Sequence, residues 1–155
     1  MKKPLFILII LIITSMLSSC FWVTMPITEK SGTSIPLERI YQPSYFGIAQ
    51  NKNETTVSFY RDIGFMGGGC AHYLYIGDVK IFEIWQGEKV TIHIPSGNYL
   101  FQIKMWGKSL EKLGMKLCKQ VTVSKEVTLK SGEHEVYRIS LSSKSKGFGF
   151  RKIKK

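Results

Sequence analysis

The segment KVTIHIPSGNYLFQIKM, residues 89–105, decides the fold class of this chain. In residues 89–94 apolar side chains alternate with polar ones, and residues 99–105 repeat the alternation. A period of two is typical of strands with one buried face. The Pro-Ser-Gly-Asn stretch at 95–98 supplies turn-forming residues. The segment therefore predicts two strands joined as a β-hairpin.

The same alternation continues on both sides of this segment. A two-residue turn is predicted at 77–78, and one short turn or helix at 108–119, where leucines are spaced three and four residues apart around Gly114. The other predicted strands are 55–60, 72–76, 80–85, 121–123, 127–129, 137–141 and, as an edge strand, 147–153. About eight short strands with turns at close spacing predict an all-β fold, an antiparallel β-sandwich or open barrel.

The first 19 residues predict an export signal. Lys2 and Lys3 precede an unbroken run of nine apolar residues, Leu5 to Ile13, and the apolar stretch ends at Leu17. This stretch is about 13 residues long, whereas a membrane-spanning helix needs roughly 20. We expect residues 1–19 to be removed on export. The alternatives are an uncleaved anchor or an ordinary secretory signal.

Leu17, Ser18, Ser19 and Cys20 resemble the lipobox of bacterial lipoproteins, a branched apolar residue and two small residues before a modified cysteine. The resemblance implies lipidation of the Cys20 thiol, cleavage before it, and a further acyl chain on the new amino group. Each buried methylene contributes about 0.8 kcal/mol, so two or three chains hold a protein firmly on a bilayer. The mature chain would begin at Cys20.

Behind the signal we expect a lipidated tether, residues 20–53, and one β-sandwich domain, residues 54–155. The tether contains three prolines and a Ser-Gly-Thr-Ser stretch, and it shows no long periodicity. Its second half also holds several aromatic and aliphatic residues. That half is therefore predicted to pack on the domain.

Four short segments of this domain resemble small bacterial lipoprotein domains that are related in pattern to the surface domains named for a Pro-Glu-Gly-Ala motif. These segments are 57–61, 75–78, 94–99 and 130–133. The chain departs from the pattern at Asp62, where proline is usual, and at Ser96, where an acidic residue or proline is common. The resemblance implies a β-sandwich without known catalysis, and it transfers no active-site residue.

The charge of the chain is strongly positive, with 22 basic and 11 acidic residues. Removing residues 1–19 takes away two lysines and no acids, so the mature part keeps a formal charge of +9. Such a field favours anionic neighbours, here lipid head groups or envelope polymers, and export excludes nucleic acid. Plain solubility is the alternative.

The basic residues gather at the end of the chain. They are Lys144, Lys146, Arg151, Lys152, Lys154 and Lys155. One interpretation is electrostatic contact with an anionic lipid or polymer. The other is that charge on an edge strand prevents edge-to-edge aggregation.

Two cysteines remain once Cys20 carries lipid. We predict that Cys70 and Cys118 form a disulfide, because the compartment outside the inner membrane is oxidising. The chain-entropy model gives such a bridge about 4 kcal/mol of stabilisation.

Few residues suggest catalysis. Cys70 and His72 suit a nucleophile with its base, or two metal ligands, but no third partner is visible. His93 lies on a polar strand face and His134 just past a turn. The glycines at 67–69 lack the Lys and Ser or Thr of a phosphate-binding loop. We predict no catalytic residue, no metal site and no cofactor.

Two tryptophans, Trp85 and Trp106, lie near predicted strand ends. An aromatic side chain there suits contact with a partner or glycan, or a place in the core, and the core is favoured.

The sequence supports three functions in descending order. The first is a membrane-anchored, non-catalytic binding or accessory module of the envelope, whose partner is an envelope protein or an anionic polymer. The second is an inhibitor or immunity lipoprotein against an envelope hydrolase, and the third is an enzyme acting on wall or lipid. Phe21 follows the cysteine, in place of the aspartate associated with inner-membrane retention, which favours the outer membrane facing the periplasm.

Overall fold

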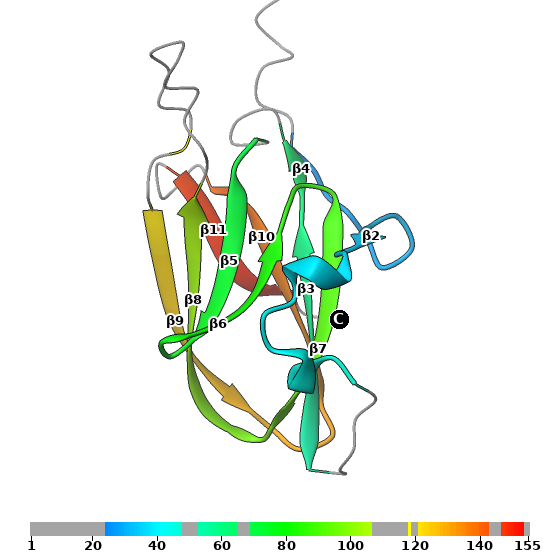
Figure 1. The fold of residues 1–155 in the computed structure, drawn as a ribbon, viewed down its shortest axis with the longest axis vertical. Coiled ribbons are helices and arrows are strands. Elements are labelled where there is room, and N and C mark those ends of the chain that lie inside the picture. The colour runs from blue at the N-terminus through cyan, green and yellow to red at the C-terminus, as the bar shows by residue number, and fades with distance from the viewer. Residues whose placement is uncertain are drawn as a thin grey trace, which may run out of the picture.

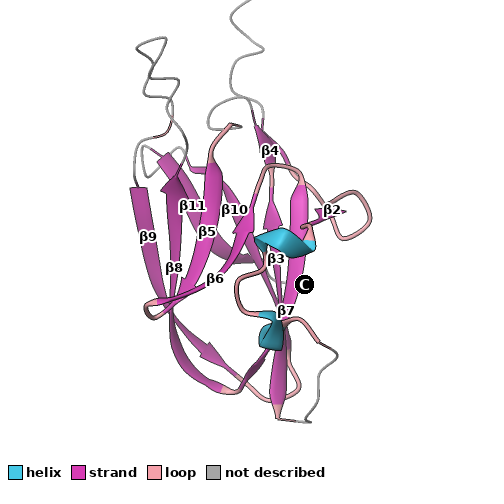
Figure 2. Ribbon diagram, viewed as in Figure 1, coloured by secondary structure: helices cyan, strands magenta, loops and turns pink. Residues whose placement is uncertain are grey.

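The computed structural model describes residues 24–47, 53–64, 69–106, 118, 121–142 and 147–153. These residues form two β-sheets packed face to face, with a short ribbon at one end (Figure 1). Strands dominate the described residues, as Figure 2 shows, so the predicted all-β sandwich is confirmed.

Among the described residues, eight strands have six residues or more, which agrees with the approximate number predicted from the sequence. They are β3 (Glu54–Arg61), β5 (Ala71–Ile76), β6 (Val79–Ile84), β7 (Glu88–Pro95), β8 (Gly97–Trp106), β9 (Val121–Leu129), β10 (His134–Ser142) and β11 (Gly147–Ile153). The short elements are β1 (Thr24–Met25), β2 (Thr33–Ser34), β4 (Ile63–Gly64) and the 3-10 turns η1 (Leu37–Arg39) and η2 (Pro43–Tyr45). The two runs predicted at 121–123 and 127–129 belong to one strand, β9.

The larger sheet, called sheet B here, has the strand order β11-β10-β3-β7-β2, and the smaller one, sheet C, has the order β6-β5-β8-β9. Most neighbours are antiparallel, as predicted. Two pairs are parallel: β3 with β10, and β2 with β7. The central β3–β10 pair joins segments about 80 residues apart in the sequence, a separation that strand alternation does not encode.

The hairpin predicted for residues 89–105 is wrong. β7 pairs with β3 and β2 in sheet B, whereas β8 pairs with β5 and β9 in sheet C. The turn at 95–98 therefore carries the chain from one sheet to the other. Each strand has one apolar face, and placing the strands in opposite sheets lets these faces meet across the core. The two-residue turn at Gly77–Asp78 is confirmed, because Ile76 pairs with Val79, and Gly77 has the positive φ of 58° that glycine tolerates.

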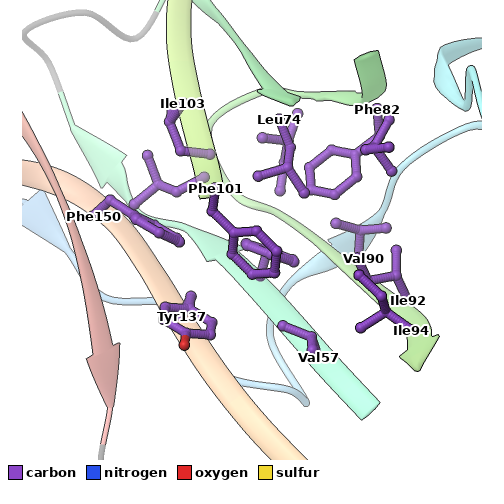
Figure 3. Packing of buried hydrophobic residues seen from close by; sticks show 14 of the residues in the cluster. Val57, Leu74, Phe82, Val90, Ile92, Ile94, Phe101, Ile103, Tyr137 and Phe150 are labelled. Atoms are coloured by element: carbon purple, nitrogen blue, oxygen red, sulfur yellow. The ribbon is translucent and has the colours of Figure 1, made fainter. Parts of the chain in front are cut away.

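The core fills the space between the sheets (Figure 3). Phe101 of sheet C meets Tyr137 and Phe150 of sheet B, with ring centroids 6.0 and 6.4 Å apart. Phe59 lies at the centre of this aromatic cluster and also contacts Phe82. Burial of such large rings dominates the stability of a small domain.

The described part of the tether, residues 24–47, packs on the sandwich. Ile35 joins the main core, and Ile27 is buried beside Tyr60 and Val136. Ile40 forms an isolated antiparallel bridge with Phe82 of β6. The second half of the tether packs on the domain as predicted, and Ile27 extends this packing toward its start.

Strand register places the ends of several strands at the same end of the sandwich. Thr24 of β1 pairs with Gly64 of β4, which follows β3. Ala71, the first residue of β5, pairs with Trp106, the last residue of β8. β9 begins beside Met105, and this whole end lies at the top of Figure 1. The opposite end carries the Gly77–Asp78 turn and the turn at 95–98.

Several predictions lie outside the described residues. They concern the signal at 1–19, lipidation of Cys20, the turn or helix at 108–119 apart from Cys118, and the glycine run apart from Gly69.

Candidate functional site

Cys70 and Cys118 are joined in a disulfide, with their Cα atoms 5.7 Å apart and a sequence separation of 48. The predicted pairing is therefore present in the structure. It ties the residue before β5 to the connection between β8 and β9. A bridged sulfur is not a thiolate, so the proposed Cys70 nucleophile beside His72 does not exist in the oxidised protein.

His72 is fully buried, and its side chain points to the interior from β5. The Arg61 Nε–H group donates to His72 Nδ1 across 3.3 Å. Burial, and to a smaller extent the neighbouring Arg61 charge, lower the pKa of His72 from the ordinary 6.5 to about 3. His72 is therefore neutral at physiological pH and shielded from any substrate in solution.

Arg61 belongs to a buried polar cluster that sequence reasoning missed. Its NH1 group donates to the Asp62 carbonyl oxygen at 3.0 Å. Asp62 Oδ1 accepts from Arg138 NH1 at 3.1 Å and from the Ile27 backbone N–H at 3.2 Å. Arg138 NH2 also donates to the Ile27 carbonyl oxygen. The cluster thus fixes the start of the described chain onto β3 and β10, which is a structural role.

The other two histidines lie on the outer face of sheet B. Ser58 Oγ is 2.9 Å from His134 Nε2 and 2.8 Å from Thr91 Oγ1, and His93 Nδ1 is 3.3 Å from Thr56 Oγ1. A serine beside a histidine is the start of a nucleophilic dyad. Ser58, however, is only 3% exposed and its hydroxyl is shared between two partners. The arrangement is a cross-strand polar ladder of the kind that stabilises sheets.

A group of aromatic and charged side chains covers the outer face of sheet C and the edge beside it. We call it the aromatic face, and it consists of Tyr41, Tyr73, Tyr75, Lys80, Glu83, Trp85 and Lys104. Lys80 Nζ lies 3.8 Å from the centroid of the Tyr41 ring and 4.1 Å from that of Tyr73. Lys104 Nζ lies 4.0 Å from the Tyr75 centroid. These cation–π contacts hold the lysine side chains in place.

Glu83 organises the same face. Its carboxylate accepts from the Tyr41 hydroxyl at 3.0 Å and from Trp85 Nε1 at 2.6 Å. Burial and the Glu83 hydrogen bond raise the pKa of Tyr41 to about 12. Burial, with the Glu83 charge, also raises the pKa of Tyr73. Both phenols therefore stay neutral at physiological pH. Tyrosine and tryptophan are enriched at protein interfaces, so the aromatic face is a candidate binding surface.

Trp85 and Trp106 do not lie in the core. Trp85 is half-buried in the aromatic face and Trp106 is 55% exposed at the end of β8, so the core position favoured for the two tryptophans is wrong for both. Alternation explains this exposure, because Phe101 and Ile103 face inward and Trp106 has the opposite parity.

The basic tail is described only in part. Lys144, Lys146, Lys154 and Lys155 lie outside the described residues. Arg151 is exposed, whereas Lys152 Nζ forms an ion pair with Glu135 Oε1 at 2.5 Å. Glu135 is 2% exposed and also accepts a hydrogen bond from the Tyr137 hydroxyl. Lys152 therefore already balances a buried carboxylate. β11 does form the edge of sheet B, as predicted.

Within the described ranges, no set of three or more His, Cys, Asp or Glu side chains is placed to hold a metal ion. No helix among the same residues has the length and apolar character needed to cross a membrane. Comparison of the chain with protein-family models, curated proteins and solved structures gives no significant match. The resemblances to the lipobox and to small lipoprotein domains rest on the quoted residues alone.

Proposed function

We propose that the protein is a lipid-anchored, non-catalytic module of the bacterial cell envelope, which faces the periplasm and binds another envelope protein through its aromatic face. The observation that carries the proposal is the short apolar leader ending in Leu17-Ser18-Ser19-Cys20. Acylation of Cys20 would hold the sandwich close to a bilayer, with the outer membrane favoured by Phe21.

Two further observations support this proposal. The Cys70–Cys118 disulfide is suited to an oxidising compartment outside the cytosol. The aromatic face presents tyrosine and tryptophan rings in fixed positions, and these residue types dominate the energetics of protein interfaces. A partner gains affinity when the side chains that it contacts are already ordered, because less conformational entropy is lost.

Lipidation is tested by growing cells with an alkyne-bearing fatty acid and detecting label on the purified protein. We expect label on the native chain and none on a Cys20→Ser variant. A native chain without label contradicts the anchor. Equal label on the variant contradicts its assignment to Cys20.

The partner surface is tested by crosslinking in intact cells from a photoreactive residue at Gln102, which pairs with Tyr75 on the outer side of sheet C. The matched control carries the same residue at Arg151, on the outer side of sheet B. We expect a discrete protein adduct from position 102 alone. Capture from position 151 alone would favour a contact at the basic tail and overturn the aromatic face as the binding surface.

A further inference from the structure

The short ribbon formed by β1 and β4 carries two exposed apolar side chains beside each other. Met25 pairs directly with Ile63, and the two residues are 56% and 38% exposed. Directly paired residues of antiparallel strands project to the same side. The ribbon thus presents one contiguous apolar spot to its surroundings.

Trp106 adds a third exposed apolar side chain at the same end of the sandwich. It is the last residue of β8 and pairs with Ala71, the first residue of β5. The β1–β4 ribbon lies at this end in Figure 1. We call Met25, Ile63 and Trp106, together with the strand ends that carry them, the ribbon end.

The short segment between Cys20 and Thr24 limits how far the ribbon end can lie from the proposed lipid anchor. Thr24 is four residues after Cys20. An extended chain spans at most about 3.5 Å per residue, so Thr24 lies within about 14 Å of the Cys20 Cα atom. If Cys20 is acylated, the lipid holds this end of the sandwich, and not the opposite one, against the bilayer.

We propose that the ribbon end rests in the interfacial layer of the membrane that anchors the protein, with Met25, Ile63 and Trp106 in contact with lipid. This inference depends on the proposed lipid anchor and adds an orientation to it. Tryptophan suits such a position, because its large apolar ring and its N–H group match the boundary between acyl chains and head groups.

Three charged residues near the ribbon end are largely buried, and their charges do not oppose lipid contact. Asp62 and Arg138, which hold Ile27 near the start of the described residues, are paired with each other at 3.1 Å, and their side chains are 4% and 14% exposed. Arg61 beside them is 1% exposed. Their charges are already shielded from water, so bringing a membrane close removes little further hydration from them.

The orientation also leaves free the part of the aromatic face around Tyr75 and Lys80, which lies toward the opposite end of β5. The strands run along the longest axis of the molecule in Figure 1, with the ribbon at one end. When that end meets the bilayer, the sheets stand away from the membrane surface, and the aromatic face of sheet C faces sideways into the periplasm.

The test uses the full-length, lipidated protein in vesicles of phosphatidylethanolamine and phosphatidylglycerol, with part of the lipid carrying brominated acyl chains. Trp22→Phe and Trp85→Phe leave Trp106 as the only tryptophan. A matched control adds Trp106→Phe and Leu100→Trp. Leu100 is 40% exposed and lies toward the other end of β8, where its carbonyl accepts from the Gly77 N–H. Circular dichroism verifies that both variants fold.

We expect brominated lipid to quench Trp106 several-fold more strongly than the tryptophan at position 100, and soluble acrylamide to show the reverse order. Adding Met25→Ser and Ile63→Ser should reduce the quenching of Trp106. Equal quenching at both positions in protein that floats with the vesicles overturns the orientation alone. So does a Trp106 that is shielded from acrylamide but not quenched by lipid, since a protein then covers it. Protein that fails to float overturns the anchor and this inference with it.

Discussion

Phe59 shows how much of the fold depends on a single side chain. It is fully buried, and its ring contacts those of Phe82, Phe101, Tyr137 and Phe150. We expect Phe59→Ala to lower the free energy of unfolding by about 3–5 kcal/mol, since it leaves a cavity between the sheets. The matched control, Leu37→Ala, alters a residue that is 81% exposed and should change stability by less than about 0.5 kcal/mol. Urea denaturation measures both. Similar values for the two variants would contradict the assigned core.

His72 makes the stability of the folded protein depend on pH, and the direction of this dependence follows from its lowered pKa. Its pKa is lowered by burial and by Arg61 from the ordinary 6.5 to about 3. Between these pH values the unfolded chain binds a proton on His72 and the folded chain does not, so stability falls as the pH decreases from 6.5 toward 3. The slope from one such group is about 1.4 kcal/mol per pH unit.

We therefore expect a stability loss of about 2 kcal/mol from His72 on going from pH 7 to pH 5. His72→Asn keeps an acceptor for Arg61 and does not titrate, so its loss over the same interval should be smaller by that amount. Denaturation curves of both proteins at the two pH values measure the difference. Parallel losses in the two proteins would show that His72 is not buried in its neutral form.

At the level of residues, sequence reasoning succeeded where alternation alone decides burial. The inward positions of β7 and β8 were predicted in this way, and so was the polar face that carries His93. It failed for Arg61, because nothing in a strand pattern predicts that a charged residue will be only 1% exposed. The Arg61 guanidinium donates to His72 of β5 and to the Asp62 carbonyl oxygen. Such burial depends on partners that only the tertiary structure brings together.

At the level of elements, the Cys70–Cys118 bridge holds the start of β5 to the connection that follows β8. Replacing both cysteines by alanine should lower the free energy of unfolding by about 4 kcal/mol, because the unfolded chain regains the freedom of a long loop. Thiol labelling of the unreduced native protein should find both sulfurs unreactive. Two reactive thiols in that sample would contradict the bridge.

In the edge strand β11, we expect one basic residue, Lys152, to contribute to folding stability, and not the positive charge of the strand as a whole. Lys152→Met removes the cation from the buried Glu135 carboxylate and should cost about 1–3 kcal/mol. Arg151→Met, on the neighbouring exposed position, should change stability by less than about 0.5 kcal/mol. Thermal or urea unfolding separates the two. Equal effects would mean that the Lys152–Glu135 pair adds nothing beyond the general charge of the tail.

Strand pairing was the main feature that the sequence could not provide. Residues 89–105 predict two strands correctly, yet alternation is the same whether two strands share a sheet or face each other from opposite sheets. The central parallel pair of β3 and β10 is hidden for the same reason, since the two segments are far apart in the chain. The aromatic face depends on this pairing as well, because register brings Tyr73 opposite both Glu83 and Lys104.

At the level of the whole molecule, the charge, the disulfide and the position of Thr24 all agree with the proposed place at a membrane surface outside the cytosol. The described part of the tether begins at the ribbon end with Thr24, and the aromatic face runs along the side of the sandwich. A mature formal charge of +9 draws such a molecule toward anionic lipid and polymer. The membrane and the protein partner thus contact different parts of the sandwich.

All of this depends on the chain being cut before Cys20 and acylated there. The most direct test is the intact mass of the protein purified from its native membrane, followed by sequencing of its N-terminal fragment. We expect a chain that starts at Cys20, carries a diacylglyceryl group and a further acyl chain, and lacks the two hydrogens removed by the Cys70–Cys118 bridge. A chain that still starts at Met1, or one that starts near Cys20 without fatty acid, would contradict this expectation.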